Sequence, residues 1–244
     1  MVLGMKMKAR QQPVVTKPLG DESVGTVRAV FLMPAEYAER AHSIGVSCGL
    51  NLTSIAVSSL DDLESACARP VDLLLSFGTG IIVPKNIIHL PNITALNIHA
   101  ASPEYPGRDP HHFAAYLGAR KYGATLHYMT DKVDAGPIVD VELFDIPKDA
   151  SAAFLLEKAN EAAIELMKRF FKSYASKGAP VSRDDIVWGA NKSTRAKFME
   201  LCRIDCDISE VEFLRRLKAT TMPGYNNLYV DIHGYRFRLE GKVK

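Results

Sequence analysis

Three side chains that can move a proton and stabilise a negative charge lie in two short segments of this sequence. Asn97 and His99 close an apolar run, and Asp134 follows in a polar turn about thirty-five residues later. A neutral imidazole accepts a proton from an attacking amine, a carboxylate orients that imidazole, and a side-chain amide donates to a developing oxyanion. Together these groups predict acyl transfer to an amine, without a serine or cysteine nucleophile.

Predicted strands position both segments. Residues 93–96 are apolar and rich in β-branched side chains, so they indicate a buried strand from whose C-terminal edge Asn97 and His99 emerge. That edge is where open α/β sheets bind ligands. A second strand over residues 124–129 precedes the turn, which could bring Asp134 back toward His99.

Each member of this trio also has an ordinary structural interpretation. A histidine after a strand is commonly a core or surface residue, Asn97 could form a turn, and Asp134 could begin an Asp-Ala-Gly turn. The joint occurrence of all three favours the catalytic interpretation, which is weaker for any one residue alone.

A metal-dependent hydrolase is an alternative, because His99, His111, His112 and His127 accompany Asp134. Adjacent residues of a helix point about 100° apart, so His111 and His112 are poor ligands for one ion, and no metal is expected. His111 follows Asp-Pro and is predicted to start a helix near the site and contact substrate. His127 is predicted to alternate with its apolar neighbour along a strand.

The surrounding chain alternates between strands and helices of similar length. This pattern is typical of an α/β fold with a Rossmann-like, mostly parallel sheet flanked by helices. The turn at residues 33–36 lacks the glycines that hold a pyrophosphate, so NAD binding is disfavoured. The predicted strands are 27–33, 52–58 and 71–77, with helices over 35–44 and 60–68.

The sequence divides into a leader, a large domain and a small C-terminal appendage. Residues 1–25 are polar and predicted to wrap the surface or be disordered. Residues 26–178 form the predicted catalytic domain, closed by an amphipathic helix over 152–174. Residues 179–244 then predict a small α+β subdomain with two helices and a β-hairpin that turns at residues 233–234.

Composition is compatible with this division and excludes few functions. The 244 residues are 47% hydrophobic and 24% charged, which suffices for one large domain with an appendage. A formal net charge of +2 argues against nucleic-acid binding that depends on overall charge. Without a signal-peptide core or a membrane span, a cytoplasmic location is expected. Four cysteines without paired CxxC motifs indicate reduced thiols, although Cys202 and Cys206 could contribute metal ligands.

Several motifs together resemble the core of the folate-dependent formyltransferases. They are Asn97-Ile98-His99, Pro106-Gly107, Gly123-Ala124-Thr125-Leu126-His127 and Asp131 through Ile138. The stretch between His99 and Gly107 is one residue shorter than usual and has Ala101-Ser102-Pro103-Glu104 in place of Ser-Leu-Leu-Pro. This departure concerns local contacts with substrate and folate and leaves the trio intact.

The resemblance implies the formyltransferase fold and N10-formyltetrahydrofolate as co-substrate. It places the pterin in an apolar cleft between the loop after the third strand and the loop that ends at Asp134. Glycines there would let the main chain approach a flat heterocycle, although Gly78 and Gly80 could simply build a turn. The folate-binding residues that it implies are Phe77, Gly78, Gly80, Ile81, Ile82, Asp131 and Val133.

The resemblance also suggests the acceptor. Sugar N-formyltransferases carry a short appendage of this kind, and the chain looks most like bacterial enzymes that formylate GDP-perosamine for O-antigen and lipopolysaccharide synthesis. A methionyl-tRNA or glycinamide ribonucleotide formyltransferase, a formyltetrahydrofolate hydrolase and a non-catalytic binding module are alternatives. No membrane or nucleic-acid partner is expected, and an unpaired hairpin edge favours a homodimer. The predicted substrate contacts are Arg108, His111 and Tyr225, with Trp188, Lys192, Arg195 and Arg215 as further options.

Overall fold

One six-stranded sheet forms the centre of the molecule. The computed structural model describes residues 25–190 and 192–240, so the predicted leader lies outside it up to residue 24. The strand order is β2-β1-β3-β4-β5-β6, in which the first four strands are parallel and β5 and β6 are antiparallel to their neighbours. The predicted Rossmann-like, mostly parallel sheet is confirmed. Its strands are β1 Val27–Leu32, β2 Leu52–Val57, β3 Leu73–Phe77, β4 Thr94–His99, β5 Lys121–Tyr128 and β6 Ile138–Asp145.

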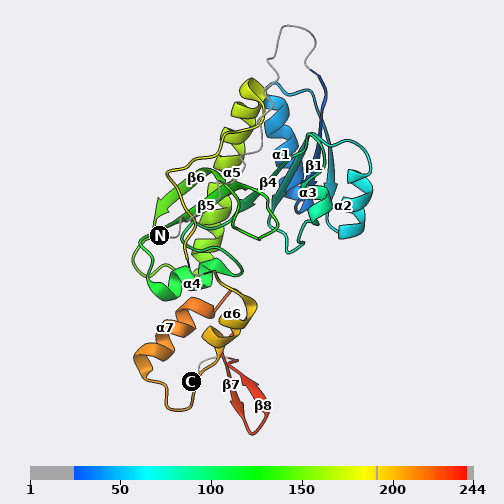
Figure 1. Ribbon diagram of the computed structural model, residues 1–244. Coiled ribbons are helices and arrows are strands. Elements are labelled where there is room, and N and C mark those ends of the chain that lie inside the picture. Colours follow the sequence, from blue (N-terminus) through cyan, green and yellow to red (C-terminus); the bar gives the residue numbers. More distant parts are fainter. Residues whose placement is uncertain (1–24, 191, 241–244) are drawn as a thin grey trace, which may run out of the picture.

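Helices cover both faces of this sheet (Figure 1). Because successive side chains of a strand point to opposite faces, Phe31 and Leu96 join one apolar core and Val30 and Leu74 the other. The first core packs beneath α1 and α5, and the second beneath α2 and α3. These helices are α1 Ala35–Ser47, α2 Leu60–Cys67, α3 Lys85–Ile88 and α5 Ala152–Lys177.

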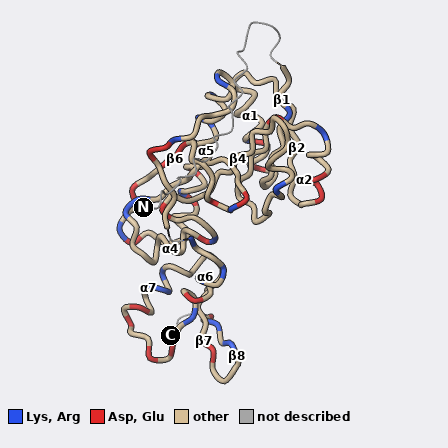
Figure 2. Tube along the Cα trace, viewed as in Figure 1, with Lys and Arg blue, Asp and Glu red and all other residues tan. Residues whose placement is uncertain are grey.

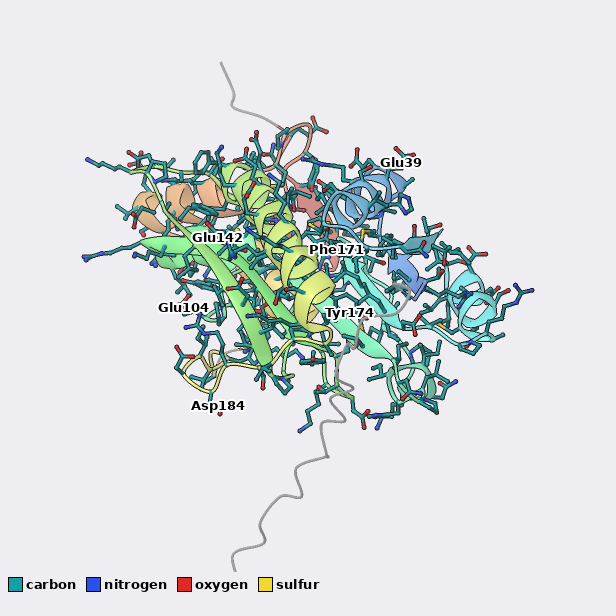
Figure 3. All side chains as sticks on the ribbon, turned by 90° about the horizontal axis from the view of Figure 1, so that it is seen from above. Glu39, Glu104, Glu142, Phe171, Tyr174 and Asp184 are labelled. Carbon is teal, nitrogen blue, oxygen red and sulfur yellow. The ribbon has the colours of Figure 1, made fainter. Side chains whose placement is uncertain are left out.

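The long helix α5 packs across one face of the sheet. Ser151 caps its N-terminus by accepting a hydrogen bond from the Phe154 amide. Its apolar stripe packs on the sheet, where Phe171 meets Phe31 with ring centroids 6.2 Å apart. Figure 3 shows the helix lying across the strands, with Phe171 and Tyr174 labelled on it. The predicted helix over 152–174 is therefore present and continues for three more residues.

The C-terminal elements pack below α4, which spans Pro110–Leu117. His112 of α4 hydrogen-bonds the Ala219 carbonyl oxygen over 2.6 Å, joining α4 to α7. The predicted hairpin is confirmed and turns at residues 233–234. The elements of this region are α6 Arg195–Cys202, α7 Glu210–Thr220, β7 Tyr229–Ile232 and β8 Tyr235–Arg238.

Charges of both signs are distributed over the described part of the trace (Figure 2). The four cysteines are free thiols. Within residues 25–190 and 192–240, no helix is both long and apolar enough to cross a membrane.

A connecting segment between α5 and α6, which we call the strap, comprises residues 180–190 and 192–193. It is hydrogen-bonded at several points to the part of the molecule that holds the six-stranded sheet, where Tyr128 donates to the Pro180 carbonyl and the Arg183 amide to the Ile138 carbonyl. Near its end, the Ser193 amide donates to the Pro106 carbonyl over 2.9 Å. The first residues after the predicted boundary at 178 therefore pack on the predicted catalytic domain.

Substituting Gly107 by alanine is expected to displace the end of the strap. Gly107 has a φ of +101°, and an added Cβ would lie 2.2 Å from the Ser193 carbonyl oxygen. We expect the free energy of unfolding to fall by about 2 kcal/mol or more, because the alanine introduces both backbone strain and a steric clash. Gly118→Ala is the matched control, because Gly118 also has positive φ but open space around it. Equal losses of stability in urea unfolding of the two variants would contradict this prediction.

Candidate active site

Asn97 and His99 of β4 lie on one face of the sheet. Asn97 and His99 are two positions apart, so they share a face, while Leu96 and Ile98 point into the core beneath α5. In the neighbouring strands, Ser76 of β3 and His127 of β5 stand opposite Asn97. The register of the sheet thus gathers polar side chains around Asn97.

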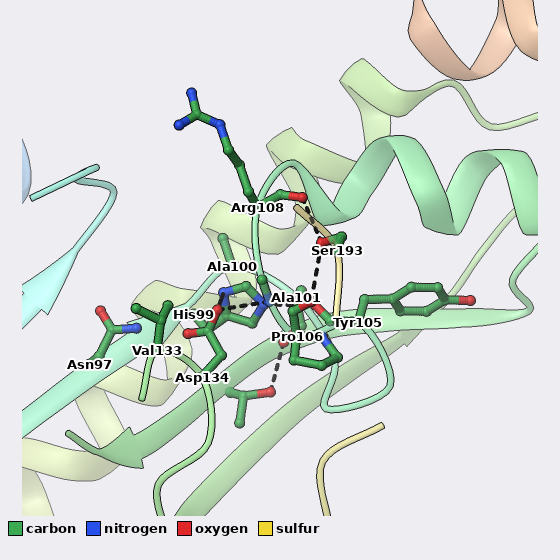
Figure 4. A network of polar contacts seen from close by, with 12 residues as sticks. Asn97, His99, Ala100, Ala101, Tyr105, Pro106, Arg108, Val133, Asp134 and Ser193 are labelled. Carbon is green, nitrogen blue, oxygen red and sulfur yellow. Dashed lines mark hydrogen bonds and ion pairs between the residues drawn. The ribbon is translucent and has the colours of Figure 1, made fainter. Parts of the chain in front are cut away.

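The loop after β5 brings Asp134 to the same place, as the sequence predicted it could. Figure 4 shows the Asp134 carboxylate facing the His99 ring. Its Oδ2 lies 3.6 Å from His99 Nδ1 and accepts a hydrogen bond of 2.9 Å from the Gly107 amide. Both side chains are nearly enclosed, with 10% of His99 and 5% of Asp134 exposed. Asp134 has a φ of +46°, an uncommon backbone conformation in which the surrounding contacts must hold this residue.

The hydrogen bonds of His99 define which nitrogen can act as a base. Nε2 lies 2.9 Å from the Tyr105 carbonyl oxygen, which can only accept, so Nε2 carries the hydrogen. In the neutral ring, Nδ1 therefore has a free lone pair beside Asp134. Burial lowers the pKa of His99 below 6.5 and outweighs the opposing effect of the Asp134 charge. His99 is thus a neutral base at physiological pH.

Asp134 stays ionised next to this base. Burial raises the pKa of Asp134, but the neighbouring rings of His127 and His99 and the hydrogen bond from the Gly107 amide together lower it to about 2. A carboxylate so close to Nδ1 stabilises the imidazolium that forms when His99 takes up a proton.

His127 is a site residue that the sequence analysis placed on a strand but did not assign to the site. Its Nδ1–H donates to the Tyr128 carbonyl oxygen over 2.9 Å, so Nε2 of the neutral ring accepts from Asn97 Nδ2 at 3.1 Å. This contact turns the amide of Asn97 so that its second N–H is available to a ligand. The antiparallel register of β4 and β5 was the missing signal, because it places His127 directly opposite Asn97.

A cavity of about 620 Å³ opens in front of these groups. The loop after β3 forms one wall, where the Ile82 side chain is 71% exposed and Val133 stands nearby with 44% exposed. The opposite wall includes Arg108 and His111, and Lys192 from the strap. Among the predicted site residues, the cavity is lined by Gly78, Gly80, Ile81, Ile82, Asn97, His99, Arg108, His111, Val133 and Asp134.

Three predicted site residues lie elsewhere. Phe77 is fully buried beneath α1 against Tyr37. It follows Ser76 in β3 and therefore points to the opposite face of the sheet from Ser76, which lines the cavity. Asp131 pairs on the surface with Lys85 at 2.7 Å. Tyr225 lies in an exposed turn of the C-terminal region.

The remaining cationic candidates differ in their freedom to bind a ligand. The Arg108 side chain points away from His99 and Asp134 (Figure 4) and is 59% exposed. Arg215 instead donates to the Tyr116 carbonyl oxygen, and its guanidinium lies over the Tyr116 ring. Burial, together with the adjacent His112, lowers the pKa of His111 to about 3, so this ring is neutral. In the described part of the chain, no group of three or more His, Cys, Asp or Glu side chains could hold a metal ion.

Comparisons with known proteins agree with this geometry. A methionyl-tRNA formyltransferase of Bacillus cytotoxicus is 31% identical over 157 residues, which are 64% of this chain and 48% of that protein. The chain thus spans about half the length of the curated relatives it matches.

Solved structures of low sequence identity share the fold. A sugar N-formyltransferase from a Shewanella species matches with a TM-score of 0.71 and 17% identity, covering 89% of this chain and 98% of the other. An N-formyltransferase from Helicobacter canadensis, in complex with folinic acid and dTDP-3-aminofucose, matches with a TM-score of 0.65 and 16% identity over 85% of each chain. The family model for formyl transferases matches residues 48–170, about half of the chain. This chain belongs to the formyl transferase family.

Proposed function

We propose that this protein transfers a formyl group from N10-formyltetrahydrofolate to the primary amine of a nucleotide-linked amino sugar. The observation that carries the proposal is the convergence of Asn97, His99 and Asp134 at one cavity. The trio stands between an apolar loop on one side and basic side chains on the other, which suits a flat heterocycle and a phosphate-bearing acceptor.

The geometry supports direct transfer. Nδ1 of His99 takes the proton of the attacking amine as its nitrogen bonds to the formyl carbon, and Asn97 donates its free N–H to the oxyanion. Asp134 stabilises the resulting imidazolium. His99 then returns the proton to N10 of the folate as the bond from N10 to the formyl carbon breaks. No acyl-enzyme is formed, and no metal is required.

The folate is proposed to lie along the loop of residues 78–83. Gly78 and Gly80 leave the main chain open to close approach, and Ile81, Ile82 and Val133 offer apolar surface. Phe77 supports this loop from the core rather than from the cavity wall. Asp131 is proposed to act indirectly, through its ion pair with Lys85.

A nucleotide sugar is the favoured acceptor class. The sugar N-formyltransferase from Shewanella is covered over nearly its whole length, and the Helicobacter canadensis enzyme holds an amino-sugar nucleotide. GDP-perosamine, a precursor of O-antigen and lipopolysaccharide, is our specific proposal within this class, acting in the cytoplasm. Arg108, Lys192 and neutral His111 are proposed to contact the nucleotide. Methionyl-tRNA is the second candidate acceptor, because the relatives that are 31% identical are named methionyl-tRNA formyltransferases.

An assay of tetrahydrofolate release separates these acceptors. The protein is incubated with N10-formyltetrahydrofolate and, in turn, GDP-perosamine, dTDP-linked amino sugars, glycinamide ribonucleotide or methionyl-tRNA. Turnover with an amino sugar alone supports the proposal. Turnover only with methionyl-tRNA would replace it, and release without any amine would indicate a hydrolase.

We further propose that the hairpin β7–β8 mediates a homodimer. Its outer side chains Ile232, Tyr235 and Phe237 are exposed, and apolar side chains of this kind are commonly buried in subunit contacts. Light scattering should give twice the monomer mass, and Tyr235→Asp with Phe237→Asp should reduce it to the monomer. A monomeric unsubstituted protein would disprove this assembly.

A further inference from the structure

Trp188, the single tryptophan of the chain, lies in the strap outside the family-matched residues 48–170. Its indole packs edge-on against His127, with ring centroids 4.9 Å apart and planes at 89°. His99 is the next ring, at 6.0 Å. Trp188 is half-buried against these rings and does not line the cavity.

The indole N–H also fixes the loop that carries Asp134. Nε1 donates to the Gly136 carbonyl oxygen over 2.7 Å. On its other side this loop presses against β5, because a Cβ on Gly136 would lie 1.8 Å from the Tyr128 carbonyl oxygen. The loop is thus held between β5 and Trp188, two residues after Asp134 with its uncommon backbone conformation.

Neighbouring bonds anchor the indole itself. The Gly189 amide donates to the Pro103 carbonyl oxygen over 2.8 Å, and Lys192 donates to the Val133 carbonyl oxygen. The strap therefore contacts the loop after β4 and the loop after β5, which together surround His99. Trp188 is its one aromatic side chain between them.

We propose that Trp188 is a positioning residue of the active site, holding the His127 ring and the Asp134–Gly136 loop so that Asn97 and Asp134 are correctly aimed at the reacting atoms. This inference rests on the proposed function, because the alignment matters only if the trio performs acyl transfer. Trp188 itself touches neither substrate. Its contribution passes through His127 to Asn97, and through Gly136 to Asp134.

Trp188→Phe is the test, since it keeps an aromatic ring against His127 but removes the bond to Gly136. We expect kcat to fall by about tenfold to a hundredfold with KM changed less than about twofold, because small displacements of catalytic groups act on the chemical step. In Trp188→Leu, which loses the aromatic ring as well, kcat should fall further. Tyr128→Phe is the matched control, because it also removes one side-chain bond to a backbone carbonyl between β5 and the strap.

The comparison separates positioning from general support. Tyr128→Phe should keep kcat within about twofold while losing a similar amount of stability in urea unfolding. Equal kcat losses in both variants, or a Trp188→Phe effect confined to KM, would overturn the proposal.

Fluorescence provides a readout that needs no formyl transfer. Trp188 is the single tryptophan of the chain and its indole packs against the His127 ring, so removing that ring should expose the indole to solvent and move its emission to longer wavelength. His127→Asn should show this shift, and an unchanged emission spectrum would place the indole elsewhere. If the shift is observed while no acceptor is formylated, the positioning geometry stands and the proposed function fails.

Discussion

Replacing His99 by asparagine is expected to lower kcat for formyl transfer by about 10²- to 10⁴-fold, the usual contribution of a positioned general base. Asparagine keeps a polar side chain that can donate to the Tyr105 carbonyl, but it cannot take up the amine proton as Nδ1 does. Because the base acts on the chemical step, KM for the folate should change little. Steady-state kinetics under saturating acceptor measure both quantities.

His42→Asn is the matched control for this substitution. His42 lies on α1 and hydrogen-bonds Ser54 over 2.9 Å, and it does not line the cavity. Its activity should stay within about twofold of the parent. A His99→Asn variant that retained more than a tenth of the parental kcat would exclude His99 as the base.

The pH profile of the parent follows from the same residue. Burial lowers the pKa of His99 in the folded protein below 6.5, so the neutral, active form persists as the pH falls through 6.5. The acid limb of kcat/KM should therefore have its midpoint below 6.5. Since the charge of Asp134 raises the pKa of His99, this limb should move to still lower pH in Asp134→Asn. A limb at or above 6.5 in the parent would contradict the assignment.

Much of the sheet was predictable because its strands alternate with helices and carry strong apolar runs. The strand β6 and the short helix α3 were not predicted. β6 has a half-buried, mixed polar surface, and α3 has only four residues, too few for a periodic signal. The trio was predictable because each member follows or ends a strong strand.

The rest of the site depends on contacts distant in sequence. The place of His127 depends on the register of two strands thirty residues apart, and that of Trp188 on the path of the strap. The prediction that Phe77 lines the cavity was wrong, because the resemblance located the loop but not the face to which each side chain points. Neighbouring residues of a strand point to opposite faces, so Phe77 enters the core and Ser76 lines the cavity.

Asp134→Asn should reduce kcat by about 10²- to 10⁴-fold, because the uncharged amide no longer stabilises the imidazolium of His99. Asparagine tolerates the positive φ of this position, so the backbone can stay in place. Asp145→Asn, which removes a carboxylate that is 87% exposed at the end of β6, is the control and should keep parental activity. If both variants were equally active, Asp134 would have no catalytic role.

The same carboxylate should make the folded state sensitive to acid. Its folded pKa of about 2 lies below the ordinary 3.8, so its ionised form stabilises the fold above pH 3.8 and this contribution disappears as the pH falls through 2. The difference corresponds to about 2 kcal/mol. Asp134→Asn cannot titrate, so its deficit in unfolding free energy should shrink by about that amount between pH 6 and pH 2. Urea unfolding of both proteins across this range measures the deficit in unfolding free energy. A deficit that does not change with pH would show that the surroundings of Asp134 do not lower its pKa.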